Sequence, residues 1–446
     1  MTTLILITLL SFEAQSTPKS WWAQYGDADL TQLVETALAK NQDLATATQR
    51  IAEARAVTGQ AKSRLSPDIN FQGSANRLRG GFNQGVIRIP NPEGQQQGGA
   101  FVSPFETGLF QGGLDMKWEL DFFGRNRRGL EAARADAEAL LLTRDDLAIT
   151  VSAEVARYYF AYRGIEERIL ITEQNLTAQR ELLELTRDRQ QAGLATQLDL
   201  ERQQLLLANT EASLPPLLAD LSVQRNRLAV LAGEEQAAKI TLRPFSQQLA
   251  VPTTAGDIPS ELLKRRPDVR AAETSLAAAQ FRVRQARTDL FPKISLNGLV
   301  GRQGLSLSGL SFGGGNFFNI GPQVQIPIFN GKRIRSQIAA EEARLAQAES
   351  AYRQEVLTAI EESANALSNL QRQQEREAKL LAATTSARNS LELSLDLFRA
   401  GATDFLTVLD SQRGVYDAEF QRAAAHTQSL IESVALYKAL AGEWLR

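Results

Sequence analysis

The chain contains two copies of one structural unit, and this internal repeat restricts its fold more than any other feature. The segment SRLSPDINFQGSANR, from Ser63, aligns without a gap on TDLFPKISLNGLVGR, from Thr288, when the chain is shifted by 225 residues (288 minus 63). Further along, the shift becomes shorter, which places a longer insertion in the first copy. We therefore predict two tandem repeats, at residues 21–232 and 258–446, joined by a linker at residues 233–257.

Each copy changes its hydrophobic periodicity in the same order. A helical pattern gives way at a proline to strict alternation of apolar and polar residues, and a helical run of about 65 residues comes later. Two alternating runs separated by a glycine-rich stretch predict a β-hairpin. The four predicted strands span about residues 67–79, 112–123, 292–302 and 319–329, with glycine-rich loops at 80–113 and 301–316.

A short break at a glycine ends each long helical run. A helix of about 65 residues is on the order of 100 Å long, which no single globular core requires. Heptad-like spacing of its apolar residues predicts that such helices pack side by side as coiled coils. Gly193 and Gly401 predict left-handed turns, after which a second helix returns. Each copy is thus expected to contain a helical hairpin, with tips at 192–196 and 400–404.

Polar residues beside these breaks indicate where the returning helices begin. Thr196 and Asp199 have the spacing of a capping box, and Asp404 is expected to be a helix N-cap. Pro215 and Pro216 lie inside the first returning helix, where we expect a kink or a short restart.

The predicted strands are rich in aromatic residues. Twelve of the nineteen phenylalanines lie within residues 63–124 and 288–331. Alternating strands of about ten residues, with aromatic residues near their ends, are typical of a transmembrane β-barrel. Because four strands cannot close a barrel and an open edge is not tolerated in lipid, several chains would have to pool their strands. A small soluble sheet with one wet face is the alternative.

Composition excludes several classes of protein. The chain has no cysteine and a formal net charge of −2, which argues against thiolate metal sites and against binding of nucleic acid. Its one histidine, His426, lies in a helical pattern and is expected to be a surface or packing residue. The sequence contains no nucleotide-binding, zinc-protease or catalytic-serine motif, so we expect no enzyme, no cofactor and no metal site.

The first residues suit an export signal. Leu4 to Phe12 form an apolar run of nine residues, too short to span a bilayer as a helix. The run suits the apolar part of a leader within residues 1–20, although the usual basic start is missing. No other segment is apolar enough for a transmembrane helix, so entry into a membrane would depend on the strands.

Segments spread over nearly the whole chain, from about Trp21 to Trp444, resemble one known family. In order they are WWAQYGDADLTQLVETAL, LDFFGRNR, RQQAGLAT, IPIFNGKR, FRAGATD, LTVLDSQR and LYKALAGEW. Together they resemble the outer-membrane factors of the TolC superfamily, most closely the channels of resistance-nodulation-division multidrug and metal efflux systems. The resemblance implies a passive, gated exit duct in the outer membrane of Gram-negative bacteria.

The resemblance also implies an assembly and its partners. Three chains would form a homotrimer, pooling four strands each into one twelve-stranded barrel surrounded by outer-membrane lipid. An α-helical tunnel would continue the barrel through the periplasm, and the glycine-rich loops would face outside the cell. The tip residues Gly193, Leu194, Gly401 and Ala402 would meet a periplasmic adaptor, which links the channel to an inner-membrane efflux pump.

A gate at the inner end of the tunnel is the last implication of the resemblance. The motif LTVLD carries Leu406 and Asp410, and Arg413 follows nearby. Residues at i and i+4 share a helix face, so three chains would form an apolar collar beside an anionic one. Without the resemblance, Asp410 would be interpreted as a solvated acid on a helix face.

Three features leave alternatives open. Many members of this branch carry a lipid on an N-terminal cysteine, but Phe12 stands where that residue is expected, so the barrel alone would have to hold the trimer in the membrane. A channel for type I protein secretion and a coiled-coil scaffold without a channel are the alternative functions. The sequence does not name a substrate, because efflux specificity generally belongs to the pump.

Overall fold

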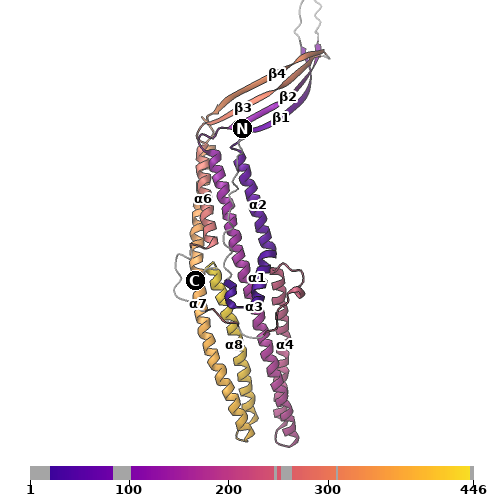
Figure 1. The fold of residues 1–446 in the computed structure, drawn as a ribbon, viewed down its shortest axis with the longest axis vertical. Coiled ribbons are helices and arrows are strands. Elements are labelled where there is room, and N and C mark those ends of the chain that lie inside the picture. Colours follow the sequence, from indigo (N-terminus) through magenta and orange to yellow (C-terminus); the bar gives the residue numbers. More distant parts are fainter. Residues whose placement is uncertain (1–20, 84–101, 246–248, 253–263, 308–309, 442–446) are drawn as a thin grey trace, which may run out of the picture. The chain divides into compact units, whose positions relative to one another are not determined.

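The computed structural model describes residues 21–83, 102–245, 249–252, 264–307 and 310–441. These residues form a predominantly helical protein with one four-stranded sheet (Figure 1). The α-helices are α1 (Ala28–Lys40), α2 (Gln42–Ser63), α3 (Arg125–Gln191), α4 (Gln197–Leu231), α6 (Pro267–Thr288), α7 (Arg333–Arg399) and α8 (Phe405–Ala439). The strands are β1 (Asp68–Asn83), β2 (Val102–Glu119), β3 (Lys293–Leu307) and β4 (Leu310–Gln325), and the 3₁₀ helices are η1 (Trp21–Tyr25) and η2 (Ala237–Lys239).

Corresponding helices of the two copies have equal lengths. Helices α2 and α6 each have 22 residues, α3 and α7 each have 67, and α4 and α8 each have 35. The two long helices agree with the run of about 65 residues that the sequence predicts. These equal lengths favour the interpretation of the chain as a duplicated unit. The expected export signal at 1–20 lies outside the described residues.

The chain divides into two compact units, and each unit takes segments from both copies. The first contains the described residues of Met1–Ile51, Ala139–Glu273 and Ser350–Arg446, and the second those of Ala52–Glu138 and Thr274–Glu349. The long helices α3 and α7 contribute residues to both units. The two copies are therefore sequence repeats, and neither forms a compact body of its own.

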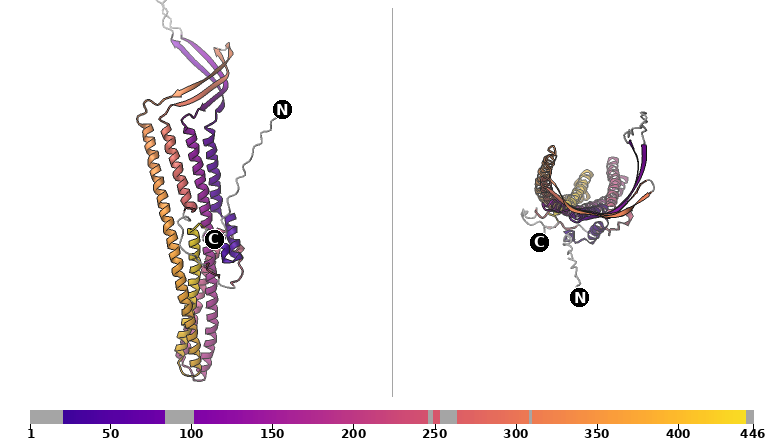
Figure 2. Two further views of the ribbon diagram at one scale, coloured as in Figure 1. Left: turned by 60° about the vertical axis from the view of Figure 1, so that its left-hand side comes forward. Right: turned by 90° about the horizontal axis from the view of Figure 1, so that it is seen from above.

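The second unit holds an antiparallel sheet with strand order β1-β2-β3-β4, which is curved (Figure 2). Residues paired directly across antiparallel strands point to the same face. One row crosses all four strands with apolar side chains only, namely Phe71, Leu114, Val300 and Phe318. A row on the opposite face consists of Ser74, Gln111, Gln303 and Gly315. The sheet thus has one apolar face and one polar face.

The strands extend further into glycine-rich sequence than the alternation predicts. The predicted loop at 301–316 is wrong, because β3 continues to Leu307 and β4 begins at Leu310. The predicted loop at 80–113 is wrong at its two ends, which belong to β1 and β2, and its middle, 84–101, lies outside the described residues. Glycine weakens a strand by itself, but hydrogen bonds to neighbouring strands hold its backbone extended.

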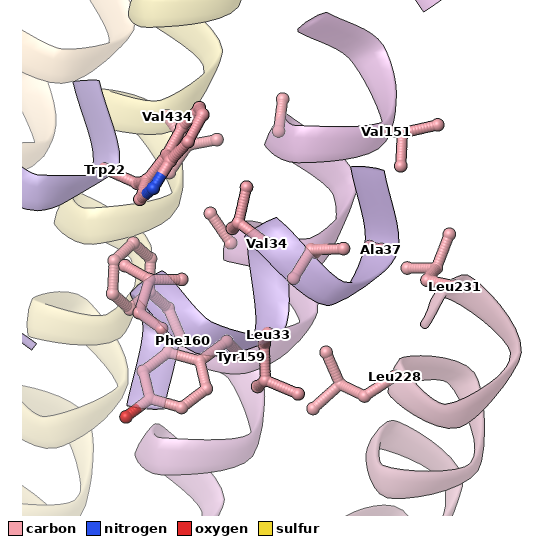
Figure 3. Close-up of a cluster of buried hydrophobic side chains, with 14 of the residues drawn as sticks. Trp22, Leu33, Val34, Ala37, Val151, Tyr159, Phe160, Leu228, Leu231 and Val434 are labelled. Atoms are coloured by element: carbon pink, nitrogen blue, oxygen red, sulfur yellow. The ribbon is translucent and has the colours of Figure 1, made fainter. Parts of the chain in front are cut away.

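The first unit is built around a core of aromatic and aliphatic side chains (Figure 3). The segment WWAQYGDADL forms η1 and the start of α1, which pack on α3, α4 and α8. Tyr159 and Phe160 of α3 are 0% exposed, and Trp21 stacks on Tyr437 with ring centroids 5.1 Å apart. Because large aromatic side chains bury more apolar area than others, this core anchors the N-terminal segment to helices of both copies.

The first returning helix, α4, contains both prolines without an interruption. It runs from Gln197 to Leu231 and includes Pro215 and Pro216, so the expected restart is wrong. Leu217, directly after the prolines, is buried, and its packing helps to hold the helix together where backbone hydrogen bonds are missing. Within the described residues, no helix is both long and apolar enough to cross a membrane.

Candidate functional site at the helical tips

Both helical hairpins turn within five residues, between α3 and α4 and between α7 and α8. The two turns share one backbone pattern. Gly193 and Gly401 have φ angles of +72° and +73°, in the left-handed region that glycine adopts without steric cost. The next amide, of Leu194 or Ala402, donates to the carbonyl five residues earlier at 2.8 Å in each tip. This Schellman pattern satisfies carbonyl groups at the end of each long helix.

The two tips are accessible to a partner. Leu194 is 70% exposed, and Ala402 and both glycines are also exposed. A Cβ atom at Gly193 or Gly401 would meet no atom within 4 Å. Both tips lie at the same end of the helical bundle of the first unit (Figures 1 and 2). The two turns that carry the four tip residues therefore lie at one end of this bundle.

The returning helices begin with side-chain caps. The amide of Asp199 donates to the Thr196 hydroxyl at 3.2 Å, and the Asp199 carboxylate accepts from the Thr196 amide at 2.9 Å, so the predicted capping box is confirmed. Asp404 accepts from the amide and hydroxyl of Thr407 at 3.0 and 2.6 Å, which confirms it as an N-cap. These hydrogen bonds hold the pKa of Asp404 below its usual value.

A small apolar cluster lies behind the tips and joins the two copies. Its buried members come from α3 and α8 and are Leu182, Phe405, Val408 and Leu409. Phe398 of α7 packs against this cluster, and the guanidinium carbon of Arg189 lies 4.3 Å from the centre of the Phe398 ring. A cation over an aromatic face is attracted to it. Apolar packing and this contact thus hold the two hairpins together near their tips.

Near its tip, α8 has one buried face and one exposed face. Val408 and Leu409 are buried, whereas Leu406 is 40% exposed and Asp410 and Arg413 are exposed. The spacing i, i+4, i+7 keeps the latter three on one side of the helix. The three predicted gate residues therefore share the face of α8 that the core of the chain leaves uncovered.

Arg413 has a partner within the chain that the sequence analysis missed. Its Nε lies 3.9 Å from Oδ2 of Asp417, and both side chains are more than half exposed. An ion pair this long and this exposed contributes little to stability. The i, i+4 spacing of arginine and aspartate on one helix is the signal that would have found it. Within the described residues, Asp410 forms no ion pair.

His426 links α8 to α7. It is buried, and its Nδ1 lies 2.8 Å from Oε1 of Glu377, while the hydroxyl of Ser429 donates to Oε2 of the same carboxylate at 2.5 Å. Burial lowers the pKa of His426, but the hydrogen bond and charge of Glu377, with the charge of Glu167 and a backbone hydrogen bond at Leu249, raise the pKa above its usual value. The interpretation of His426 as a packing residue agrees with this contact. Among the described residues, no group of three acidic or histidine side chains is arranged to hold a metal ion.

The chain is duplicated, it carries paired helical hairpins, and the apolar face of its curved sheet is uncovered. Together these features define a class of outer-membrane channel proteins. The model of the outer membrane efflux protein family matches residues 33–234 and 258–442, so the chain belongs to this family.

Curated relatives and solved structures agree with this assignment. The chain is 33% identical over 436 residues to the pyoverdine export outer membrane protein OpmQ of Pseudomonas putida, a match that covers 97% of this chain and 90% of that protein. It is 31% identical to the outer membrane protein OprJ of Pseudomonas aeruginosa, over 95% of this chain and 86% of that protein. The solved outer-membrane channel OprN superposes with a TM-score of 0.82 at 34% identity, over 95% of this chain and 92% of that one.

The chain is therefore an efflux channel protein of the Gram-negative outer membrane that extends into the periplasm. Its family consists of efflux channels rather than enzymes. The resemblance that the sequence shows to these channels, and the efflux-channel function that it implies, are confirmed.

Proposed function

We propose that three copies of the chain assemble as a homotrimer and pool their strands into one transmembrane β-barrel of twelve strands, three times four. The helical hairpins continue this barrel as a tunnel through the periplasm. In this assembly the protein is the passive, gated exit duct of a tripartite efflux pump. It conducts small molecules that the pump exports across the envelope.

The sheet is the observation that carries this proposal. Its apolar face is uncovered within the chain, where Phe71 is 73% exposed and Phe318 is 76% exposed. Strands β1 and β4 are each paired on one side only. In lipid, an unpaired strand edge costs several kcal/mol for each unsatisfied group. Pairing β1 of one chain with β4 of the next removes both edges, and three such joints close a barrel.

The helical tips support docking to a periplasmic adaptor. Glycine at positions 193 and 401 leaves the backbone open to close approach by a partner. Leu194 supplies an exposed apolar side chain, and Ala402 is small. We therefore propose that Gly193, Leu194, Gly401 and Ala402 form the contact surface for the adaptor, which connects the channel to an inner-membrane pump.

The exposed face of α8 supports a gate. In a threefold assembly, Leu406 forms an apolar collar and Asp410 forms an anionic collar one helical turn away. Three carboxylates close to one axis repel one another, so neighbouring helices have to hold them in place. The ion pair of Arg413 with Asp417 is long and exposed, which leaves the guanidinium able to exchange partners and bridge to an adjacent helix.

The known relatives support a small-molecule cargo. OpmQ, which matches this chain over almost its full length, is a pyoverdine export protein. In the proposed duct, the channel provides the exit path and the pump selects the substrate. We propose no cofactor for this role, since passive conduction requires no chemical step.

Cysteine cross-linking tests the barrel, because the chain has no cysteine of its own. Ser74→Cys on β1 is combined in turn with single cysteines at successive positions of β4, from Asn316 to Gln325. A disulfide requires Cβ atoms within about 4.5 Å. Oxidation of the membrane fraction should therefore give covalent trimers on a denaturing gel at the β4 positions that face Ser74 across the joint.

A matched pair within one chain provides the control. Gln111 and Gln303 are direct partners on β2 and β3, so cysteines at both positions should form a bond inside each chain and give monomers only. If no β4 position gives a covalent trimer while the control pair oxidises fully, β1 and β4 of adjacent chains do not meet. The proposed barrel would then be wrong.

A further inference from the structure

The segment between β4 and α7 combines exposed apolar side chains with a cluster of cations. We refer to residues 326–335, with the sequence IPIFNGKRIR, as the junction segment. In its apolar part, Ile326 is 60% exposed, Ile328 is 93% exposed and Phe329 is 91% exposed. Its cationic part, also exposed, consists of Lys332, Arg333 and Arg335. The two parts adjoin in the chain at the point where the sheet ends and the helix begins.

The cations of the junction segment lack acidic partners. Throughout the described parts of the chain, no acidic side chain pairs with Lys332, Arg333 or Arg335. The first turn of α7 contains no acidic residue, and the N-terminus of a helix itself carries a partial positive charge. Three cations therefore lie where their mutual repulsion and the helix dipole are both unfavourable. An anion bound beside them would remove both effects.

The backbone at Lys332 is strained. Its φ angle is +68°, and that of the preceding Gly331 is +57°. A lysine in the left-handed region is uncommon, and glycine or asparagine adopts this conformation at lower cost. A lysine at a position that suits glycine better indicates that its charge has a use there.

The first copy of the repeat provides an internal comparison. There the start of α3 carries Arg125, Arg127 and Arg128, and each has an acidic partner. The nitrogen–oxygen distances are 2.8 Å to Asp289, 3.3 Å to Asp121 and 2.7 Å to Glu131. Acidic partners within the chain thus neutralise the cations of the first copy, whereas the corresponding cations of the second copy have no such partner within the described residues. Asp289, Asp121 and Glu131 are therefore already bound within the chain.

We propose that the junction segment binds the headgroup of an anionic phospholipid in the leaflet that faces the periplasm. Its apolar side chains lie among the acyl chains, and its cations attract the phosphate. Apolar and aromatic side chains next to lysine and arginine are typical of the membrane interface. This inference rests on the proposed placement of the sheet in the membrane.

Native mass spectrometry of the purified full-length protein tests the site. The protein is exchanged into detergent with equal amounts of phosphatidylglycerol and phosphatidylcholine, and the lipids retained are counted. We expect the parent protein to retain phosphatidylglycerol preferentially. In the triple variant Lys332→Gln, Arg333→Gln and Arg335→Gln, this preference should fall by about fivefold for each cation removed at low salt. Raising the salt concentration should weaken the preference of the parent, since salt screens exposed charges.

Two control variants separate this site from general charge effects. Arg372→Gln, Arg376→Gln and Lys379→Gln remove the same charge from exposed positions further along α7 and should leave the preference unchanged. The second control replaces Lys332 with arginine and replaces Arg333 and Arg335 with lysine. This variant keeps the charge, so it should retain phosphatidylglycerol as the parent does.

Three outcomes would overturn the site. They are equal retention of both lipids by the parent, full retention of phosphatidylglycerol by the triple glutamine variant, and loss of the trimer rather than of the lipid in that variant. Single-channel conductance of the Leu406→Ala, Asp410→Ala variant in a planar bilayer separates this inference from the proposed function, because the closed parent of a gated channel conducts little. If this variant conducts and the parent does not prefer phosphatidylglycerol, the lipid site alone is refuted, whereas a variant that does not conduct refutes the channel.

Discussion

Replacing Gly164 with alanine tests how closely α3 and α8 approach within the first unit. Gly164 lies inside α3, and a Cβ atom there would lie 2.0 Å from Oγ1, 2.6 Å from Cγ2 and 2.8 Å from Cβ of Thr427. The Thr427 hydroxyl is held by a hydrogen bond to the carbonyl of Ala423 at 2.9 Å. Its Cβ is fixed to the backbone of α8 and cannot rotate away. The two helices therefore have to separate to accept the methyl group.

The contact distances set the size of the effect. Ordinary van der Waals contact of a Cβ begins at 3.4 Å, so the distance to the Thr427 Cβ has to grow by about 0.6 Å, from 2.8 Å. Overpacking a well-packed core costs about 1–3 kcal/mol, and three atoms closer than 3.0 Å place this site at the upper end. Alanine is better than glycine in a helix interior by about 1 kcal/mol. The net loss of unfolding free energy should be about 2 kcal/mol.

Urea unfolding of the purified full-length protein, followed by tryptophan fluorescence and circular dichroism, measures this loss. Gly59→Ala is the matched control, since Gly59 lies inside α2 and a Cβ atom there meets nothing within 4 Å. That variant should be more stable than the parent by about 0.5–1 kcal/mol. Thr427→Gly removes all three close atoms, so Gly164→Ala should no longer be destabilising in the double variant. The two substitutions should therefore show a coupling energy of about 3 kcal/mol.

Two results would refute this reasoning. One is a Gly164→Ala variant that is stabilised to the same extent as Gly59→Ala. The other is an additive double variant, in which Thr427→Gly leaves the cost of the alanine unchanged. Either result would mean that α3 and α8 have room for a methyl group at this crossing.

The remaining predictions concern the gate, the tips and the dependence on pH. Asp410→Ala and Leu406→Ala should each raise single-channel conductance in a planar bilayer, because they remove the charged and the apolar collar, and the double variant should leak most. Gly193→Trp or Gly401→Trp should abolish efflux, read as drug resistance of cells, while trimer and membrane insertion persist, because a bulky side chain blocks adaptor docking. Glu377 raises the pKa of His426, so their contact stabilises the fold fully below the unfolded pKa of 6.5 and is lost as the pH rises through the higher folded pKa. The urea midpoint of the parent should therefore fall as the pH rises above 6.5 and through the raised folded pKa, and that of His426→Gln should not.

Each of these predictions has a clear contrary result. Gate variants that conduct like the parent would place the constriction elsewhere in the tunnel. Unchanged drug resistance in both tip variants would move the adaptor surface away from the glycine turns. Because the chain has one histidine and no cysteine, an equal pH dependence in parent and His426→Gln would show that the contact with Glu377 does not control stability in this range.

The elements that depend on neighbouring residues could be predicted from the sequence. The left-handed turns at Gly193 and Gly401 and the capping box of Thr196 and Asp199 follow from sterics and hydrogen bonds within a few residues. The two 67-residue helices follow from periodicity in the same way. Helical spacing alone also predicts that one helix face carries Leu406, Asp410 and Arg413. Their role at a gate stays a proposal.

Elements that depend on distant partners could not be predicted in this way. Glycine-rich sequence is extended in β3 and β4 because the ladder between them holds it, and glycine carries no local signal of that pairing. The helix α4 passes through Pro215 and Pro216 without a restart, because packing against other helices contributes more to its stability than local propensity does.

The repeat, the order of elements within it and the geometry of the tips follow from the amino-acid sequence, because each of these is encoded by residues that are close together in the chain. Which distant groups meet depends on how the folded chain packs. It places Thr427 against Gly164, and it gives Arg125 a carboxylate 164 residues away at Asp289. The equivalent cations around Lys332 receive none within the described residues. The two copies share one local sequence pattern, but their cations differ in whether they have an acidic partner. An ion pair requires a carboxylate, and the packing of distant segments determines whether one lies nearby.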